Sequence, residues 1–426
     1  MYLETDERKA NNPNLTPQRK IFNDPVYGFI TIPDNIVFEI IEHPYFQRLR
    51  RIKQTALTHL VYPGALHTRF HHAIGAMYLM TQAINVLRMK GKEITDNEAE
   101  AATIAILLHD IGHGPYSHTL EKSIIFETSH EDLSEIFMDR LNEIFYGKLS
   151  LAIEIFNNTY KKKFLHQLIS SQLDVDRLDY LKRDSYFTGV YEGIVSTDRI
   201  IKMLDVDDDE LVVEVKGIYS IEKFIIARRL MFWQVYLHKT VLAAEYMLMK
   251  VLKRAKILSE NGENLFATPV FKLFLKNNFT KNDFLNDKTL LDKFSQLDDY
   301  DVFTSLKVWC NHPDIILSEL SKSLVYRRLF KIELQNEKFS EEYLHKIRIQ
   351  ASKKFNIKDD DLEYFVFSDI TSNYAYDPHG GKIKILYKDG KICDIAEASD
   401  QLNISVLSKP VTKYFICYPK TIKFAF

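Results

Sequence analysis

Apolar residues recur at the spacing of an α-helix through most of the first 285 positions of this chain. Placed at i, i+3 and i+4, they give each helix one apolar face. We expect N-caps at Asp34 and Asp96, a break at Pro44, and one long helix from about 220 to 259. The other clear helical stretches are NIVFEII (35–41), AIGAMYLMTQAINVLRM (73–89) and NEAEAATIAILLHD (97–110).

The pattern changes after about residue 285. Short helical segments continue to about residue 355, and strand-like segments follow, with Asp389-Gly390 as a typical hairpin turn. Upstream, ELVVEVKGIYS (210–220) predicts a short hairpin that turns at Gly217. The expected C-terminal strands are YFVFS (364–368), KIKILYKDGKICDI (382–395) and VTKYFICYP (411–419). We therefore predict a mainly α fold, with a helical domain over 1–285 and a smaller α+β region over 286–426.

Composition narrows the functional classes. The net charge is −2, so the chain lacks the global basic field of a protein whose main partner is nucleic acid. No apolar run approaches the roughly 20 residues that cross a bilayer, and the polar segment at residues 1–14 is unlike a signal peptide. The three cysteines, Cys310, Cys393 and Cys417, are too few and too far apart for a disulfide framework. We expect a cytoplasmic protein without a membrane anchor.

The segment ILLHDIGHGPYSH (106–118) gathers three histidines and an aspartate at the end of an apolar run. Neighbouring helical side chains point about 100° apart, so His109 and Asp110 can share one ion only near a helix end. The glycines and proline that follow predict such an end. A stable divalent site needs more ligands, and His72 and the aspartates of LDVDRLDYLKRD (173–184) are candidates.

Six ordered blocks of the sequence resemble one protein family. They are NDPVYG (23–28), FQRLRRIKQ (46–54), VYPGALHTRFHHAIG (61–75), LLHDIGHGPYSH (107–118), DVDRLDYLKRD (174–184) and VYLHK (235–239). They are similar to HD-domain phosphohydrolases, and within these to the deoxynucleoside triphosphate (dNTP) triphosphohydrolases, from about Lys20 to Lys388. The resemblance implies an HD-domain helical fold. It also implies that water attacks the α-phosphorus of a dNTP and releases deoxynucleoside and intact tripolyphosphate.

The resemblance further implies a divalent metal ion, with magnesium, manganese, iron or zinc all compatible with nitrogen and oxygen ligands. The implied ligands are His72, His109, Asp110 and Asp176. His71 competes for the first position, but the family phrase RF-x-H places the ligand second. The implied active-site residues are His113, His118, His130 and Glu121. His118 is the candidate general acid for the leaving oxygen, because imidazole titrates near neutral pH, and Glu121 or Asp184 could orient it.

The same matches imply a substrate site. The cations that match triphosphate-binding positions are Arg69, Arg177, Arg228 and Lys239, and guanidinium groups suit phosphate oxygens. The residues that match those facing the deoxyribose 3′-hydroxyl are Gln54, Tyr180 and Asp184. Tyr236 matches an aromatic that excludes ribose. Thr55 replaces a larger apolar side chain of the best-known relative, which weakens the expected discrimination against ribonucleotides.

Matches outside the active site imply regulation by nucleotides. The residues that match a site for an activating dGTP or GTP are Lys20, Ile21, Glu42, Gln47 and Arg50. The cations that match a neighbouring effector site for a dNTP are Arg199, Lys216, Arg327, Lys331 and Lys388. Such sites would lie between subunits of a homo-oligomer, a dimer or a tetramer. The simpler interpretation of YRRLFK (326–331) is a solvated basic face.

Three alternatives stay open at this point. One is another HD phosphohydrolase, acting on nucleoside monophosphates, alarmones or cyclic dinucleotides, although the GYP segment of cyclic-dinucleotide esterases is not seen. A second is a nucleic-acid-binding nuclease that uses KRAK (253–256) and YRRLFK as basic patches. A third is a catalytically silent nucleotide sensor.

Overall fold

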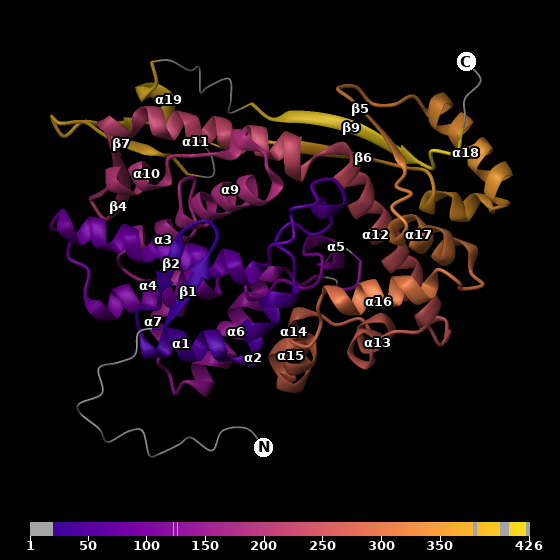
Figure 1. Ribbon diagram of the computed structural model, residues 1–426, viewed down its shortest axis with the longest axis horizontal. Helices are drawn as coiled ribbons and strands as arrows, with labels where there is room; N and C mark the ends of the chain where they lie inside the picture. Colours follow the sequence, from indigo (N-terminus) through magenta and orange to yellow (C-terminus); the bar gives the residue numbers. More distant parts are fainter. Residues whose placement is uncertain (1–19, 122, 126, 378–380, 401–408, 423–426) are drawn as a thin grey trace.

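The computed structural model describes residues 20–121, 123–125, 127–377, 381–400 and 409–422, and only the backbone of His118. The polar segment at residues 1–14 lies outside the described residues. One connected core of buried apolar side chains runs from Ile30 to Ile422. Helices predominate (Figure 1), which confirms the mainly α fold with a smaller α+β C-terminal part. The division of the chain at residue 285 stays a prediction.

The first half of the chain is built from helices that, except for α5, lie in the left part of Figure 1. They are α1 (Asn35–Glu42), α2 (Pro44–Gln47), α3 (Arg69–Met89), α4 (Asp96–Leu108), α5 (His118–Glu121), α6 (His130–Ile144), α7 (Ser150–Phe156), α8 (Lys163–Ile169), α9 (Val175–Thr188) and α10 (Thr197–Met203). The remaining helices are α11 (Ile218–Met231), α12 (Lys239–Glu260), α13 (Pro269–Lys276), α14 (Lys281–Asn286), α15 (Lys288–Phe294), α16 (Asp299–Trp309), α17 (Ile315–Val325), α18 (Glu341–Phe355) and α19 (Ile395–Ala398).

Three small sheets accompany the helices in the described residues. Their strands are β1 (Ile21–Asp24), β2 (Gly28–Thr31), β3 (Leu204–Asp207), β4 (Glu210–Glu214), β5 (Lys331–Gln335), β6 (Phe367–Asn373), β7 (Lys384–Leu386), β8 (Ile392–Asp394) and β9 (Val411–Tyr418). The strand orders are β1-β2, β3-β4-β7-β8 and β5-β9-β6. Only the β4–β7 pair is parallel, and it joins the helical part to the C-terminal part. The hairpin predicted at Asp389-Gly390 is confirmed, because β7 and β8 pair antiparallel around it.

The predicted helix starts are partly confirmed. Pro44 begins α2 and separates it from α1, and Asp34 precedes α1 without a capping hydrogen bond from its side chain. The prediction for Asp96 is wrong, because Thr95 is the N-cap of α4. The Thr95 hydroxyl accepts from the Glu98 N–H at 3.2 Å, and the Glu98 carboxylate accepts from the Thr95 N–H at 2.8 Å. This reciprocal pair satisfies two backbone donors.

The single long helix predicted from 220 to 259 is wrong. A π-helical segment, Phe232–Tyr236, interrupts it between α11 and α12. The His238 ring then caps α12, where Nδ1 accepts from the Thr240 N–H at 3.2 Å. Apolar residues keep their helical spacing across the interruption, so the period did not indicate it. π-Helical turns are rare and often occur at functional sites.

The hairpin predicted to turn at Gly217 is also wrong. The hairpin pairs β3 with β4 and turns at Asp208 and Asp209, which have φ of 47° and 61°. Aspartate tolerates this left-handed conformation better than most residues. Gly217 instead lies directly before α11.

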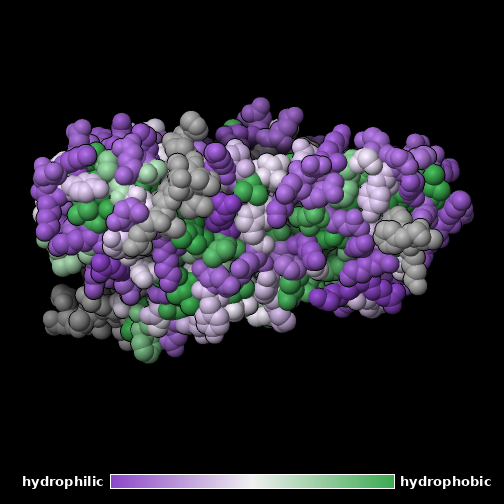
Figure 2. All heavy atoms as spheres, turned by 90° about the horizontal axis from the view of Figure 1, so that it is seen from above, coloured by the Kyte–Doolittle hydropathy of each residue, from purple (hydrophilic) through white to green (hydrophobic). Residues whose placement is uncertain are grey.

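The surface agrees with the composition. Hydrophilic residues cover most of the face seen in Figure 2, and hydrophobic residues appear there in separate patches. Among the described residues, none of the helices has the length and apolar character that a bilayer crossing requires.

Candidate metal centre and active site

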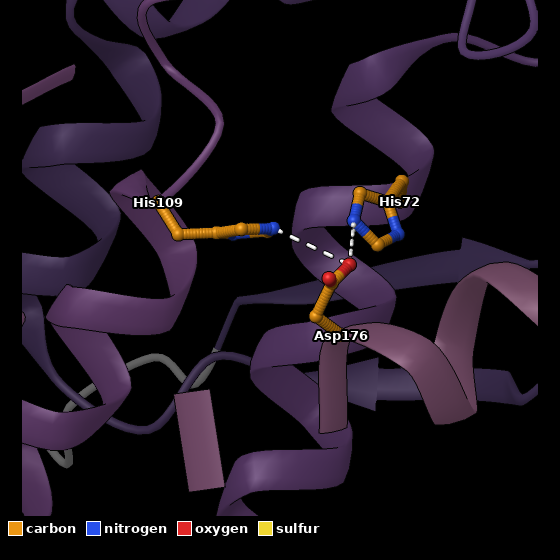
Figure 3. Close-up of side chains that lie close together, drawn as sticks. All are labelled: His72, His109 and Asp176. Carbon is orange, nitrogen blue, oxygen red and sulfur yellow. Dashed lines mark ion pairs between the residues drawn. The ribbon is translucent and has the colours of Figure 1, made fainter. Parts of the chain in front are cut away.

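Four side chains from three segments meet at one point. His72 Nε2 and His109 Nε2 lie 3.0 Å and 3.5 Å from the same atom, Asp176 Oδ1 (Figure 3). Asp110 faces the same two nitrogens, with its carboxylate oxygens 3.9 Å from His72 and 3.5 Å from His109. The four residues implied as metal ligands are thus brought together.

Local structure determines which atoms face this point. Helix α4 ends at Leu108, so His109 and Asp110 lie where helical geometry ends, as predicted. The His71 ring caps α3, because its Nδ1 accepts from the Thr68 N–H at 3.2 Å. That role turns His71 away and leaves His72 to face Asp176. Asp174 caps α9 and accepts from the Arg177 N–H at 2.7 Å, which places Asp176 in the first turn.

The chemistry of these atoms fits a divalent ion. The Nδ1 of His72 lies 2.7 Å from Asp179 Oδ2, and the Nδ1 of His109 lies 2.7 Å from the Ile106 carbonyl oxygen. Both acceptors require a proton on Nδ1, so each Nε2 can offer a lone pair to a metal. Neither Nε2 has hydrogen-bond geometry to any partner in the described part of the chain. Buried nitrogens facing carboxylates without hydrogen bonds are typical of a ligand set.

The electrostatics of the site require positive charge. Burial alone would lower the pKa of His72, but the carboxylates of Asp176 and Asp179 outweigh burial and raise this pKa to about 10. Burial would raise the pKa of Asp176, but His109 and His72 hold it below its ordinary value. Either extra protons or a cation must therefore balance these carboxylates.

A buried chain of charges supports His72 from behind. Asp179 accepts from Arg183 at 2.9 Å and 3.0 Å, and Arg183 donates to Asp24 at 2.7 Å. A Cβ on Gly75 would lie 2.1 Å from both Asp179 and Arg183, so only glycine allows this approach to α3. Such outer partners fix the orientation and basicity of a metal-binding histidine. Asp179 belongs to the 173–184 segment whose aspartates were candidate ligands, but its role as the outer partner of His72 was not predicted.

A second group of side chains lies beside the first and is connected to it by Asp110. His113 Nε2 is 3.4 Å from Asp110 Oδ1. The His113 and His130 rings stack at 3.9 Å with an angle of 15°, and Glu121 Oε1 is 3.0 Å from His130 Nδ1 and 3.9 Å from His113 Nδ1. These three side chains offer ligand atoms close enough together for a metal ion. Stacked rings keep their lone pairs parallel, however, which is a poor geometry for two ligands of one ion. The group therefore also suits proton transfer.

The loop between the two groups is held by two buried charged residues. Arg48 has no exposed surface and donates to the carbonyls of Ile111 and His113 at 2.6 Å and 2.9 Å. Asp299, at the start of α16, accepts from the Tyr116 N–H at 3.1 Å. Tyr116 has φ of 53°, a conformation that costs energy for a residue with a side chain. The sequence carried no signal for either contact, because both partners are distant along the chain.

Three arginines surround the centre. Arg69 donates to Asp110 at 2.5 Å and to the Ser117 hydroxyl at 2.6 Å. Arg177 pairs with Asp174, and Arg228 donates to Gln172 at 3.1 Å. In each of the three, the Nε is buried and has no hydrogen-bond partner in the described residues. Buried donors without acceptors indicate that an anion belongs here.

The residues predicted to face the sugar form a second set. Tyr236 donates to Asp184 Oδ2 at 2.7 Å, and the rings of Tyr180 and Tyr236 lie 6.1 Å apart. Burial and the Asp184 charge raise the pKa of Tyr236 well above its ordinary value, so the phenol stays a donor. The Oε1 of Gln54 is buried and lacks a partner among the described residues. Lys239 is exposed at the start of α12, and no ion pair of the described chain joins it to this set.

A cavity of about 440 Å³ opens beside the metal-site residues His109, Asp110 and Asp176. Its walls come from the start of α6, the end of α7 and the end of α8, together with Arg177. The side chain of His118, predicted as the general acid, lies outside the described residues.

The residues predicted for effector binding are placed in several regions. Arg50 donates to Gln47 at 2.8 Å, and its guanidinium lies 3.6 Å from the centre of the Phe70 ring. Burial lowers the pKa of Arg50, and the negative charge of Glu42 acts in the opposite direction. Both Lys20 and Ile21 are exposed; Ile21 begins β1, and Lys20 directly precedes it. Arg199 donates to the Lys216 carbonyl at 3.0 Å.

The other predicted effector cations lie on separate elements. Arg327 donates to the Leu60 carbonyl at 2.7 Å, Lys331 pairs with Glu333, and Lys388 is exposed between β7 and β8. Figure 1 shows β5, where Lys331 lies, to the right of the centre and β7 toward the left end. One chain therefore does not bring the second effector set together.

Comparison with known proteins agrees with this geometry. The HD domain matches residues 69–184, and the HD associated region matches residues 195–265. A crystal structure of a phosphohydrolase from Bacteroides thetaiotaomicron is 54% identical, covers 94% of this chain and 100% of that chain, and has a TM-score of 0.91. The uncharacterized protein YwfO of Bacillus subtilis is 32% identical over 423 residues, with 95% of this chain and 93% of that protein covered.

The name of a third relative states an activity. The deoxynucleoside triphosphate triphosphohydrolase SAMHD1 homolog of Dictyostelium discoideum is 31% identical over 255 residues, which are 55% of this chain and 49% of that protein. The chain is thus a hydrolase that belongs to the HD-domain phosphohydrolase family, among relatives of the deoxynucleoside triphosphate triphosphohydrolases.

Proposed function

We propose that this HD-domain hydrolase cleaves dNTPs into deoxynucleoside and tripolyphosphate with the help of a divalent ion. The observation that carries the proposal is the meeting of His72, His109, Asp110 and Asp176 next to buried arginine donors that lack acceptors. A site with both features suits a polyanion whose reacting phosphorus lies near a metal. The activity for which the Dictyostelium relative is named supports the same substrate class.

The metal would be held by the two Nε2 atoms and the carboxylates of Asp110 and Asp176. When bound, a divalent ion lowers the pKa of water and stabilises the charge that develops on phosphate oxygens. Magnesium, manganese, iron and zinc all suit this mixture of nitrogen and oxygen ligands.

The chain's own residues supply the remaining steps. Arg69, Arg177 and Arg228 would bind the triphosphate oxygens and neutralise charge. The connected pair His113 and His130, with Glu121, would hold a proton near Asp110 and pass it toward the leaving 5′-oxygen, either directly or through His118. Burial and the Arg69 charge hold the pKa of His113 well below its ordinary value, so this ring is neutral near pH 7 and readily passes on a proton that it receives.

Helix α9 would orient the nucleotide. Asp176, Tyr180 and Asp184 follow each other at i, i+4 and i+8 and therefore share one face of α9. The metal ligand and the sugar-side carboxylate are thus about 12 Å apart along the axis. The α-phosphate would lie at the Asp176 end and the sugar at the Asp184 end, with Gln54 and Tyr236 beside it.

Product analysis tests this proposal. The purified protein, loaded with each metal in turn, is incubated in ¹⁸O water with every dNTP, every NTP, nucleoside monophosphates, a cyclic dinucleotide and single-stranded DNA. We expect equal amounts of deoxynucleoside and tripolyphosphate from dNTPs, with the label in tripolyphosphate, because water attacks phosphorus. Pyrophosphate and monophosphate as products, or activity on DNA or cyclic dinucleotides alone, would contradict the proposal.

We also propose that dGTP, GTP or a dNTP binds between subunits and drives assembly into a dimer or tetramer. The separation of Lys331 on β5 from Lys388 beside β7 in one chain supports a site completed by a second copy. Sedimentation with and without dGTP tests this regulation, and an unchanged oligomer without activation by any dNTP would remove it.

The three free cysteines support a reducing cytoplasm as the location.

A further inference from the structure

His67 lies at the end of a hydrogen-bonded series that leads to the sugar-side residues. Its side chain has no exposed surface, and its Nε2 is 2.6 Å from Asp184 Oδ1. The other oxygen of Asp184 accepts from the Tyr236 hydroxyl at 2.7 Å. One buried ring therefore contacts the carboxylate that also holds Tyr236.

The His67 ring is held rigidly on its other sides. It stacks on Phe187 with ring centroids 4.5 Å apart and an angle of 15°. A Cβ on Gly64 would lie 2.4 Å from the Phe187 carbonyl oxygen, so the loop before His67 presses directly on the end of α9. Tyr62 in the same loop donates to the Gln234 carbonyl inside the π-helical segment. The loop thus joins Phe187 of α9 to the segment that ends at Tyr236.

The second nitrogen of the ring gives a further indication. His67 Nδ1 is buried and has no hydrogen-bond partner in the described residues. A neutral histidine carries its proton on one of its two ring nitrogens. Because Asp184 is the hydrogen-bond partner of this ring, the favoured tautomer has the proton on Nε2, and the Nε2–H donates a hydrogen bond to Asp184. A purely structural buried histidine usually satisfies both nitrogens. This ring instead places its full hydrogen-bonding strength on one carboxylate.

We propose that His67 is a positioning residue that fixes the Asp184 carboxylate, and through it the Tyr236 hydroxyl, for recognition of the sugar 3′-hydroxyl. This inference rests on the proposed function, because it takes Asp184 to be the group that faces the sugar. Each Asp184 oxygen already accepts one hydrogen bond from the protein, and its remaining lone pair points in a direction set by His67 and Tyr236. A substrate hydroxyl then meets a carboxylate that is already oriented, so binding requires less reorganisation.

Two substitutions of His67 separate this role from simple packing. His67→Phe keeps an aromatic ring on Phe187 and removes the N–H, whereas His67→Gln keeps an amide donor. The matched control is His59→Gln, since His59 lies in the same loop and its Nδ1 is 3.1 Å from the Ala56 carbonyl oxygen. Circular dichroism and thermal unfolding establish that each variant is folded.

Steady-state kinetics are measured with dGTP and with 2′,3′-dideoxyguanosine triphosphate, which lacks the 3′-hydroxyl. We expect His67→Phe to raise KM for dGTP about tenfold to a hundredfold, the range for loss of a hydrogen bond to a charged group, with kcat reduced less than about threefold. KM for the dideoxy substrate should change little, because the interaction with the hydroxyl is already absent. His67→Gln should recover part of the loss, and His59→Gln should match the wild type. Equal losses for both nucleotides, or no loss, would overturn the proposal.

A magnetic-resonance measurement keeps the inference separate from the proposed function. With ¹⁵N-labelled histidine, we expect His67 to carry its proton on Nε2 and the signal of that proton to shift in Asp184→Ala. If the wild type hydrolyses no dNTP, the proposed function fails, and this measurement alone decides whether His67 orients Asp184. A proton on Nδ1, or a signal unchanged by Asp184→Ala, would overturn that orientation.

Discussion

His72 Nε2 lies 3.0 Å from Asp176 Oδ1, although α4 to α8 separate the two residues along the chain. The contact exists because α3 packs directly against α9. His109 and Asp110 then approach from the end of α4 and complete the group. The metal centre is therefore a product of tertiary packing, and changes in its ligands and in their supports should have different consequences.

Replacing a proposed ligand should remove both metal and activity. We expect His109→Ala and Asp176→Ala to abolish hydrolysis, a loss larger than the roughly hundredfold that follows when an outer partner is removed. Metal content by mass spectrometry should fall in parallel, while circular dichroism stays unchanged. His345→Ala, an exposed histidine on α18, is the control. Unchanged turnover in either ligand variant would remove the metal assignment.

Replacing an outer partner should weaken the metal site and the fold together. Asp179 holds His72 Nδ1 and pairs with the buried Arg183. We expect Asp179→Asn to lower metal affinity about tenfold to a hundredfold. It should also destabilise the protein by about 3–5 kcal/mol, because a buried cation loses one of its two carboxylates. Metal titration and urea unfolding measure the two effects, and unchanged affinity would show that Asp179 does not tune His72.

Arg48 should matter for the active-site loop. In Arg48→Met the carbonyls of Ile111 and His113 lose a buried donor, which costs about 1–3 kcal/mol for each unsatisfied group. We also expect a lower kcat, since the loop carries His113 beside Asp110. Arg51→Met is the control, because Arg51 is partly exposed and pairs with Asp298, and such pairs contribute at most about 1 kcal/mol. Equal effects of the two substitutions on unfolding and kcat would contradict this role.

Acid stability should depend on Glu98, which lies away from the metal centre. Burial would raise the pKa of Glu98, but Lys162 at 2.8 Å and Tyr160 at 2.6 Å outweigh burial and lower it to about 2. The stabilisation is therefore present above the ordinary pKa of about 4.5 and is lost as the pH falls toward 2. We expect about 1–2 kcal/mol, reduced by solvent screening.

Urea unfolding of the wild type and of Glu98→Gln between pH 7 and pH 2.5 measures this contribution. The variant should be less stable at pH 7, and the difference should shrink as the pH falls. A difference that is constant over this range would contradict the assignment to Glu98.

The helical fold and the metal ligands could be predicted because their signals are local. The helical period marks α3 and α4, and Gly112, two residues after Asp110, marks the helix end where the His109 and Asp110 side chains can share an ion. The choice of His72 over His71 as the ligand followed from the family phrase RF-x-H. The structure supplies a physical reason for this choice, because the His71 ring caps α3.

The parts that could not be predicted depend on contacts between distant segments. Arg48 reaches the Ile111 carbonyl, and His67 reaches Asp184, and no spacing in the sequence indicates either contact. The π-helical segment that ends at Tyr236 was not predicted, because apolar residues keep their α-helical spacing through it. The start of α4 was misplaced by one residue because a threonine and an aspartate stand side by side, and only the reciprocal bond with Glu98 favours Thr95.

Anomalous diffraction from crystals soaked in manganese or iron, with and without dGTP, tests the central claim most directly. We predict one strong peak about 2.0–2.3 Å from His72 Nε2, His109 Nε2 and carboxylate oxygens of Asp110 and Asp176. We also predict that the triphosphate lies between this peak and Arg69, Arg177 and Arg228. The absence of a peak at this point, or a peak held instead by His113, Glu121 and His130, would contradict it.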